Sequence, residues 1–149
     1  MLSSPSTAQI LEGLRTEIQE AIIPEVTVPS ARLALEMLDN VLSNLAVRAA
    51  HEISWMRDEA EQIDALGGQL DDAATQAALA AYRATDRESL HLDDVQVAYD
   101  RASEVLSCVV EHAMRTGDDA LLTAGRSLLS IRLERELAIM GDWQMIGRG

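Results

Sequence analysis

Lysine and phenylalanine are absent from this chain of 149 residues, and cysteine occurs once. Without lysine, Schiff-base chemistry is excluded, as are the lysines of a phosphate-binding loop and of a kinase. The lone Cys108 excludes a disulfide within the chain, as expected for a cytoplasmic protein. No glycine-rich phosphate motif and no strained serine turn occurs either, so no catalytic residue can be assigned.

Long apolar runs and an excess of positive charge are also missing. No stretch reaches the ~20 apolar residues that cross a membrane. The start, Met1 to Pro5, has neither the positive region nor the apolar core of a signal peptide. The net charge of −13 comes from 25 acidic residues against 12 arginines, and it would repel nucleic acids and anionic lipids. We therefore expect a cytoplasmic location, no nucleic-acid partner and no membrane.

Alanine and leucine, which favour helices, supply 22 and 20 residues, while glycine and proline supply 8 and 3. No glycine- or serine-rich linker interrupts the chain, so residues 1–149 are predicted to form a single domain. The fold class is predicted as all-α, an up-down helical bundle of four to five helices with a long second helix. The expected helices start near Ser6, Ser30, Asp71, Asp93 and Asp118, and they end at Pro24, at Gly67-Gly68, at about Ala84, at Gly117 and at Gly141.

The second helix would be about 50 Å long and carries an apolar stripe with 3-and-4 spacing. The stripe resumes at Ile53 after a shift in register, because two steps of four follow each other. Its first part consists of Leu35, Leu38, Leu42, Leu45 and Ala49. The helices starting near Ser30, Asp93 and Asp118 are expected to form the centre of the bundle, joined by the helix starting near Ser6.

A metal-binding hypothesis rests on side chains of the second and fourth helices. Cys108 and His112 are four residues apart, Glu104 lies one turn earlier, and His51 would have to come near them. The Glu-x-x-His spacing of a bundle di-metal site is missing. A half-buried thiol beside boundary polar residues is the simpler interpretation, so no metal and no cofactor is expected.

Other charged groups favour structural roles. The three Asp pairs at the expected helix starts are interpreted as caps; they are Asp71-Asp72, Asp93-Asp94 and Asp118-Asp119. Spaced carboxylates resemble magnesium ligands of helical nucleotide pyrophosphatases in spacing only, and a solvated face is favoured; they are Glu17, Glu20, Asp58, Glu61 and Asp64. Arg126, Arg132 and Arg135 could hold an anion, but a surface ion-pair network, including Arg132 with Glu136, is favoured.

Apolar side chains outside the main stripes predict an interface. They lie on the second helix and in the tail after Gly141; the candidates are Leu33, Val47, Trp55, Trp143, Met145 and Ile146. Uncovered apolar surface usually marks an interface, and a twofold dimer is the commonest assembly. We therefore expect a homodimer.

Two stretches resemble a family of small, uncharacterised bacterial all-helical proteins. One runs from Pro5 through Pro24 to Leu45, and the other runs from Arg115 through Leu122 and Leu133 to the terminal tail. Members of that family are commonly encoded beside aminoglycoside-phosphotransferase-like kinases and acyl-CoA dehydrogenase-like proteins. The resemblance implies an accessory role near acyl-CoA or phosphotransfer metabolism and a protein partner encoded nearby.

The leading function hypothesis is a non-catalytic accessory or protein-interaction bundle. Two alternatives stay open at this point. One is a metal-dependent hydrolase with an acidic helical site and a nucleotide-type substrate, and the other is a binder of a small apolar ligand in the bundle core.

Overall fold

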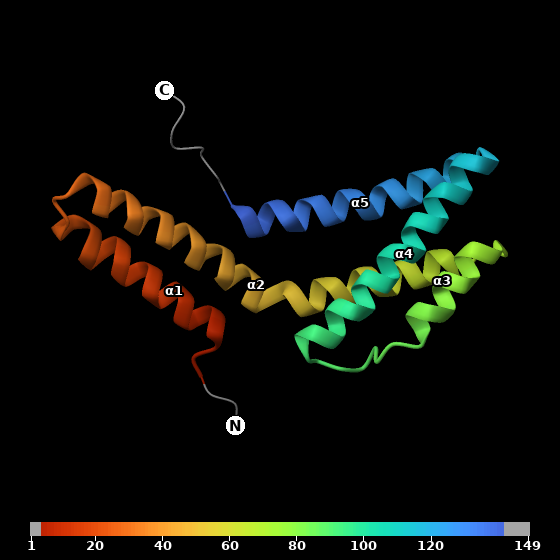
Figure 1. Ribbon diagram of the computed structural model, residues 1–149. Coiled ribbons are helices and arrows are strands. Elements are labelled where there is room, and N and C mark those ends of the chain that lie inside the picture. The colour runs from red at the N-terminus through yellow and green to blue at the C-terminus, as the bar shows by residue number, and fades with distance from the viewer. Residues whose placement is uncertain (1–3, 142–149) are drawn as a thin grey trace. The chain divides into compact units, whose positions relative to one another are not determined.

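The computed structural model describes residues 4–141, and this part of the chain contains five α-helices and no strand (Figure 1). The prediction of an all-α bundle with a long second helix is thereby confirmed. The helices are α1 (Thr7–Glu17), α2 (Pro29–Gly67), α3 (Ala73–Arg83), α4 (Leu92–Thr116) and α5 (Asp119–Met140). None of these helices is both long enough and apolar enough to cross a membrane.

The helix boundaries follow local sequence signals. Ser6 and Gln9 form the expected capping box, in which each side chain accepts a hydrogen bond from the other residue's backbone N–H. Gly117 ends α4 in the left-handed conformation, with φ of 70°. After α1 the chain continues through a π-helical turn, Ile18–Ile22, and a 3₁₀ turn, Ile23–Glu25, so Pro24 lies inside the last turn. α2 begins at Pro29, one residue before Ser30, because proline is well suited to a first helical position.

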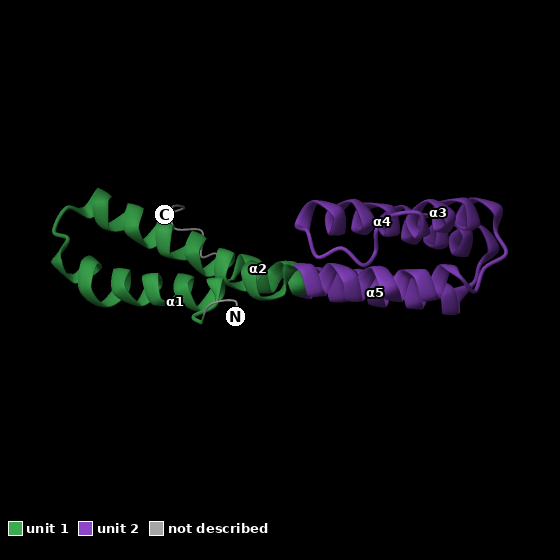
Figure 2. Ribbon diagram, turned by 90° about the horizontal axis from the view of Figure 1, so that it is seen from below, with its two compact units in different colours: residues 1–52, 135–149 green, residues 53–134 purple. Residues whose placement is uncertain are grey.

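The chain divides into two compact units (Figure 2). Unit 1 comprises residues 1–52 and 135–149, and unit 2 comprises residues 53–134. α2 and α5 each contribute residues to both units. The single domain predicted over residues 1–149 stays a prediction.

Unit 2 contains the hydrophobic core. The largest fully buried apolar side chains come from α2, α3 and α4; they are Ile63, Leu79, Val105 and Val109. All six residues expected on the apolar face of α4 are buried: Val95, Ala98, Ala102, Val105, Val109 and Ala113. Leu121 and Leu128 of α5 complete this core.

The expected role of the first helix in this core is wrong. The core of unit 2 includes Leu79 and Tyr82 of α3, which are 1% and 3% exposed, and α1 belongs to unit 1. The alanine-rich third helix gave a weak sequence signal, yet its small side chains let it lie close to α4. Two large side chains one turn apart, Leu79 and Tyr82, are therefore enough for α3 to pack against the core.

Unit 1 has few buried side chains. Among its described residues only Ile18, Asp39 and Ala46 are buried. α1 and the first part of α2 form an antiparallel hairpin, which Figure 1 shows in red and orange. A polar contact holds this hairpin together: Arg15 Nε donates to Asp39 Oδ1 at 3.0 Å, and Gln19 Nε2 donates to Asp39 Oδ2 at 2.7 Å.

Candidate functional site

One side of the hairpin in unit 1 is apolar and uncovered. Ile10 and Leu14 of α1 are both 50% exposed, and Leu38 and Leu45 of α2 are 45% and 43% exposed. Leu35 and Leu42 lie beside them and are half-buried. Each residue turns an α-helix by about 100° around its axis. Counted from the buried Ile18, Ile10 and Leu14 are rotated to one side of α1. Counted from the buried Ala46, Leu38 and Leu45 are rotated around α2 in the same direction. In an antiparallel pair of helices, both sets then lie on one side.

We call this surface the hairpin face and define it as Ile10, Leu14, Leu35, Leu38, Leu42 and Leu45. It contains no charged residue. Charges flank it one heptad further along each helix: the exposed Glu17 follows Ile10 by seven residues, and Glu52, which pairs with Arg48, follows Leu45 by seven residues. In a protein of net charge −13, an uncharged apolar surface is suited to contact another apolar surface.

The sequence-based interface candidates only partly coincide with this face. Leu33 is 41% exposed, and Val47 and Trp55 are half-buried. Trp143, Met145 and Ile146 lie outside the described residues. The exposed leucines of the hairpin face were recognised as an apolar stripe, but they were expected in the core. α1 does carry large apolar residues, but Ile10 and Leu14 are themselves 50% exposed on the same side of the hairpin, so they do not cover these leucines.

Unit 2 contains a buried polar network that joins α2, α4 and α5. Arg132 Nε donates to Glu59 Oε1 at 2.7 Å, and the Tyr99 hydroxyl donates to Glu59 Oε2 at 3.1 Å. Glu59 is 2% exposed. Arg132 also donates to Ser103 Oγ at 3.1 Å and lies over the ring of Tyr99, with Cζ 5.0 Å from the centroid.

This network corrects the expected role of Arg132. The arginine was expected in a surface network with Glu136, but its ion-pair partner is Glu59, 73 residues away in sequence. Because both Glu59 oxygens accept hydrogen bonds within the network, the network is a structural element of the core.

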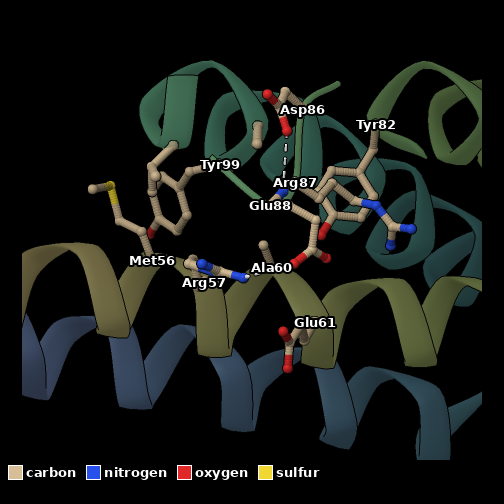
Figure 3. A pocket seen from close by; sticks show the side chains of 11 residues that line it. Met56, Arg57, Ala60, Glu61, Tyr82, Asp86, Arg87, Glu88 and Tyr99 are labelled. Carbon is tan, nitrogen blue, oxygen red and sulfur yellow. Dashed lines mark hydrogen bonds and ion pairs between the residues drawn. The ribbon is translucent and has the colours of Figure 1, made fainter. Parts of the chain in front are cut away.

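A small cleft opens next to Tyr99, between α2, α4 and the loop after α3 (Figure 3). Met56, Arg57, Tyr82 and Arg87 are among its lining residues. Arg87 covers the ring of Tyr82 with Cζ 5.7 Å from the centroid, and burial raises the pKa of the Tyr82 hydroxyl. The volume of about 90 Å³ is far below the roughly 300 Å³ of a small-molecule site. The cleft therefore gives no support to the apolar-ligand alternative.

A second hollow lies between α4 and α5 of unit 2. Its lining is apolar except for Arg126, with Val110 and Met114 on one side and Leu122 and Leu129 on the other. Its volume is about 420 Å³, and Met114 is 70% exposed. No polar group other than Arg126 could orient a ligand there.

The side chains suggested for metal binding have other contacts. His112 Nδ1 lies 3.1 Å from Asp72 Oδ1, and Glu104 pairs with Arg101 at 3.0 Å. Burial raises the pKa of the Cys108 thiol, and the nearby Glu111 raises it further, which disfavours the thiolate that a metal needs. His51 belongs to unit 1, whereas the other three belong to unit 2. Residues 4–141 contain no group of three or more His, Cys, Asp or Glu side chains that could hold a metal ion.

Two of the three Asp pairs cap helices. Asp72 accepts a hydrogen bond from the N–H of Thr75 at the start of α3, and Asp118 accepts one from the N–H of Leu121 at the start of α5. The third pair differs, because His91 holds the N-cap position of α4 and Asp94 accepts from the Ser89 hydroxyl at 2.7 Å.

The Asp72 cap also carries charge. The Thr75 N–H, His112 and Arg115 lower the pKa of Asp72 from 3.8 to about 2. A lowered pKa in the folded state means that this carboxylate stabilises unit 2 above pH 3.8 and that its contribution is lost as the pH falls towards 2.

The spaced carboxylates do not form one site in the described residues. Glu17 and Glu20 belong to unit 1, and Asp58, Glu61 and Asp64 belong to unit 2. Asp64 accepts a hydrogen bond from Arg83 Nε at 2.7 Å. These carboxylates therefore give no support to a magnesium site.

Comparison with known proteins yielded no relative: no family model, no curated protein and no solved structure matches the chain.

Proposed function

We propose that this protein is a non-catalytic interaction protein that forms a homodimer through the hairpin face. The observation that carries this proposal is the half-covered apolar stripe of α2, in which Leu38 and Leu45 are 45% and 43% exposed. A helix pair that buries one large apolar side chain, Ile18, lacks the core that a stable unit needs. A second protein surface would supply the missing half of that core.

The size of the uncovered surface supports this function. Among its described residues, unit 1 exposes eleven large apolar side chains, each by 41–58%. Complete burial of such a side chain contributes roughly 1.5–3 kcal/mol, so the four half-exposed residues Ile10, Leu14, Leu38 and Leu45 contribute roughly 3–6 kcal/mol in each copy. Two copies together reach about 6–12 kcal/mol, which is comparable to the ~4–15 kcal/mol cost of association. A reversible dimer is therefore the expected assembly.

The wider role is proposed from the resemblance to bacterial all-helical proteins. On this proposal, the dimer is an accessory protein in the cytoplasm of a bacterium, linked to acyl-CoA or phosphotransfer metabolism, and it binds a protein encoded nearby. The hydrolase alternative has no observation in its favour in residues 4–141. The observation that favours the apolar-ligand alternative is the hollow of about 420 Å³ between α4 and α5, in whose lining only Arg126 has a polar side chain.

The double variant Leu38→Asp/Leu45→Asp tests the proposed function. Carboxylates on the hairpin face would have to be desolvated in the dimer, so the variant is expected to be monomeric. Static light scattering should give about twice 16.2 kDa for the unchanged chain and 16.2 kDa for the variant.

The matched control is Leu90→Asp/Val97→Asp, which adds the same charge at exposed positions of unit 2. This control should remain dimeric, and circular dichroism should show unchanged helix content in all three proteins. An unchanged mass of the hairpin variant, or a monomeric unchanged chain at tens of micromolar, would contradict the proposal.

A further inference from the structure

We propose that two copies of the chain pair their hairpins into an antiparallel four-helix bundle, with the twofold axis at Leu42. This inference rests on the proposed function, because it requires the hairpin face to be the dimer surface. It adds which helices meet, in which direction and in which register.

The spacing of the α2 stripe fits a helix–helix seam. Leu35, Leu38, Leu42, Leu45 and Ala49 follow each other at steps of three, four, three and four. This is the heptad pattern in which side chains of one helix fit between those of a parallel or antiparallel neighbour. The structure leaves this seam partly open: Leu38 and Leu45 are almost half exposed, on either side of the half-buried Leu42.

The neighbours of α2 in unit 1 leave this seam accessible. α1 meets α2 at Asp39 and Ala46, about 100° around the helix from Leu38 and Leu45. The last turn of α5 lies on another side, where the side-chain amide of Asn44 is 2.7 Å from the carbonyl oxygen of Ile139 and can donate to it when its nitrogen is assigned to that position. In a four-helix bundle each helix has two neighbours at about a right angle around its axis. For α2 these neighbours would be α1 of the same copy and α2 of the second copy.

Charge favours the antiparallel direction. Residues 53–67, the part of α2 that follows the hairpin, contain four acidic residues and one arginine, so they carry a net charge of −3. A parallel pair would bring these two segments together, whereas an antiparallel pair separates them along helices about 58 Å long. Antiparallel neighbours also place opposite ends of the helix dipoles side by side.

The register follows from the symmetry of the seam. Leu42 is its central residue, so in a twofold antiparallel pair it meets the partner's Leu42. Leu38 then lies opposite the partner's Leu45. The large side chain of Leu35 lies opposite the small side chain of the partner's Ala49. Alternation of large and small side chains lets such layers interlock.

Disulfide crosslinking of the full-length chain distinguishes the two directions. In a Cys108→Ser background, Leu42→Cys is expected to form a covalent dimer on mild oxidation. Leu38→Cys alone and Leu45→Cys alone are expected to stay uncrosslinked, because their copies lie ~12 Å and ~9 Å apart along the axis, beyond the ~7 Å limit for a disulfide. An equimolar mixture of these two variants, one carrying a mass tag, should form the mixed covalent dimer.

Val97→Cys in the same background is the matched control, since Val97 is 55% exposed in α4 and lies outside the hairpin face. It should not crosslink. Light scattering before oxidation establishes that each variant is still a dimer. Self-crosslinking of all three seam variants would show a parallel pair and overturn the inference.

A dimer without any seam crosslink would overturn the inference too. If such a dimer is still lost in Leu38→Asp/Leu45→Asp, the proposed function stands while this arrangement falls. A monomeric chain rejects both.

Discussion

Arg132→Leu is expected to lower the free energy of unfolding by about 3–5 kcal/mol, because it leaves the buried Glu59 without its cation. Glu59 is 2% exposed, and Arg132 approaches its Oε1 atom to 2.6 Å. The Tyr99 hydroxyl, at 3.1 Å, is a neutral donor and does not replace the positive charge of Arg132 beside this buried carboxylate. Urea unfolding followed by circular dichroism measures the loss.

Two controls separate the loss of pairing from general damage. Arg101 forms an exposed pair with Glu104, so Arg101→Ala should cost less than about 1 kcal/mol. The double variant Glu59→Met/Arg132→Leu removes both charges and should recover most of the stability. If Arg132→Leu and Arg101→Ala cost the same, the network has no special role in the core.

Gly67→Ala is expected to lower the free energy of unfolding by about 1–3 kcal/mol, although alanine favours helices. A Cβ atom on Gly67 would lie 2.7 Å from Cγ1 of Val105, which is fully buried and cannot move away. Gly13, in the middle of α1, has no atom within 4 Å of an added Cβ. Gly13→Ala should therefore raise stability, by about 0.5–1 kcal/mol. Thermal or urea unfolding measures the change in stability of both variants. If both variants were stabilised, or both destabilised, the packing described for Gly67 would be contradicted.

Much of the fold could be predicted from the sequence because its signals are local. Capping side chains and terminal glycines act within a few residues, so Ser6, Asp72, Asp118, Gly117 and Gly141 mark helix ends where the structure has them. The buried face of α4 could also be predicted from the sequence, because all of its residues face the same core.

The candidate site could not be predicted in the same way, because an apolar stripe does not reveal what covers it. Leu38 and Leu45 have the same spacing as buried positions, and only the tertiary structure shows that α1 leaves them exposed. Arg132 and Glu59 are 73 residues apart in the sequence, so no local sequence pattern predicts their ion pair. One signal was present: the shift in register between Ala49 and Ile53 falls beside the division of the chain between residues 52 and 53.

Amide hydrogen exchange at two protein concentrations tests most directly whether a second copy completes the hairpin. Linkage predicts that residues 35–49 of α2 exchange more slowly when the concentration is raised about a hundredfold, because the dimer protects them. Residues 102–113 of α4, which include fully buried side chains of unit 2, should exchange at the same rate at both concentrations. Equal and strong protection of residues 35–49 at a concentration where the mass is 16.2 kDa would show that the hairpin is complete by itself and would contradict the account.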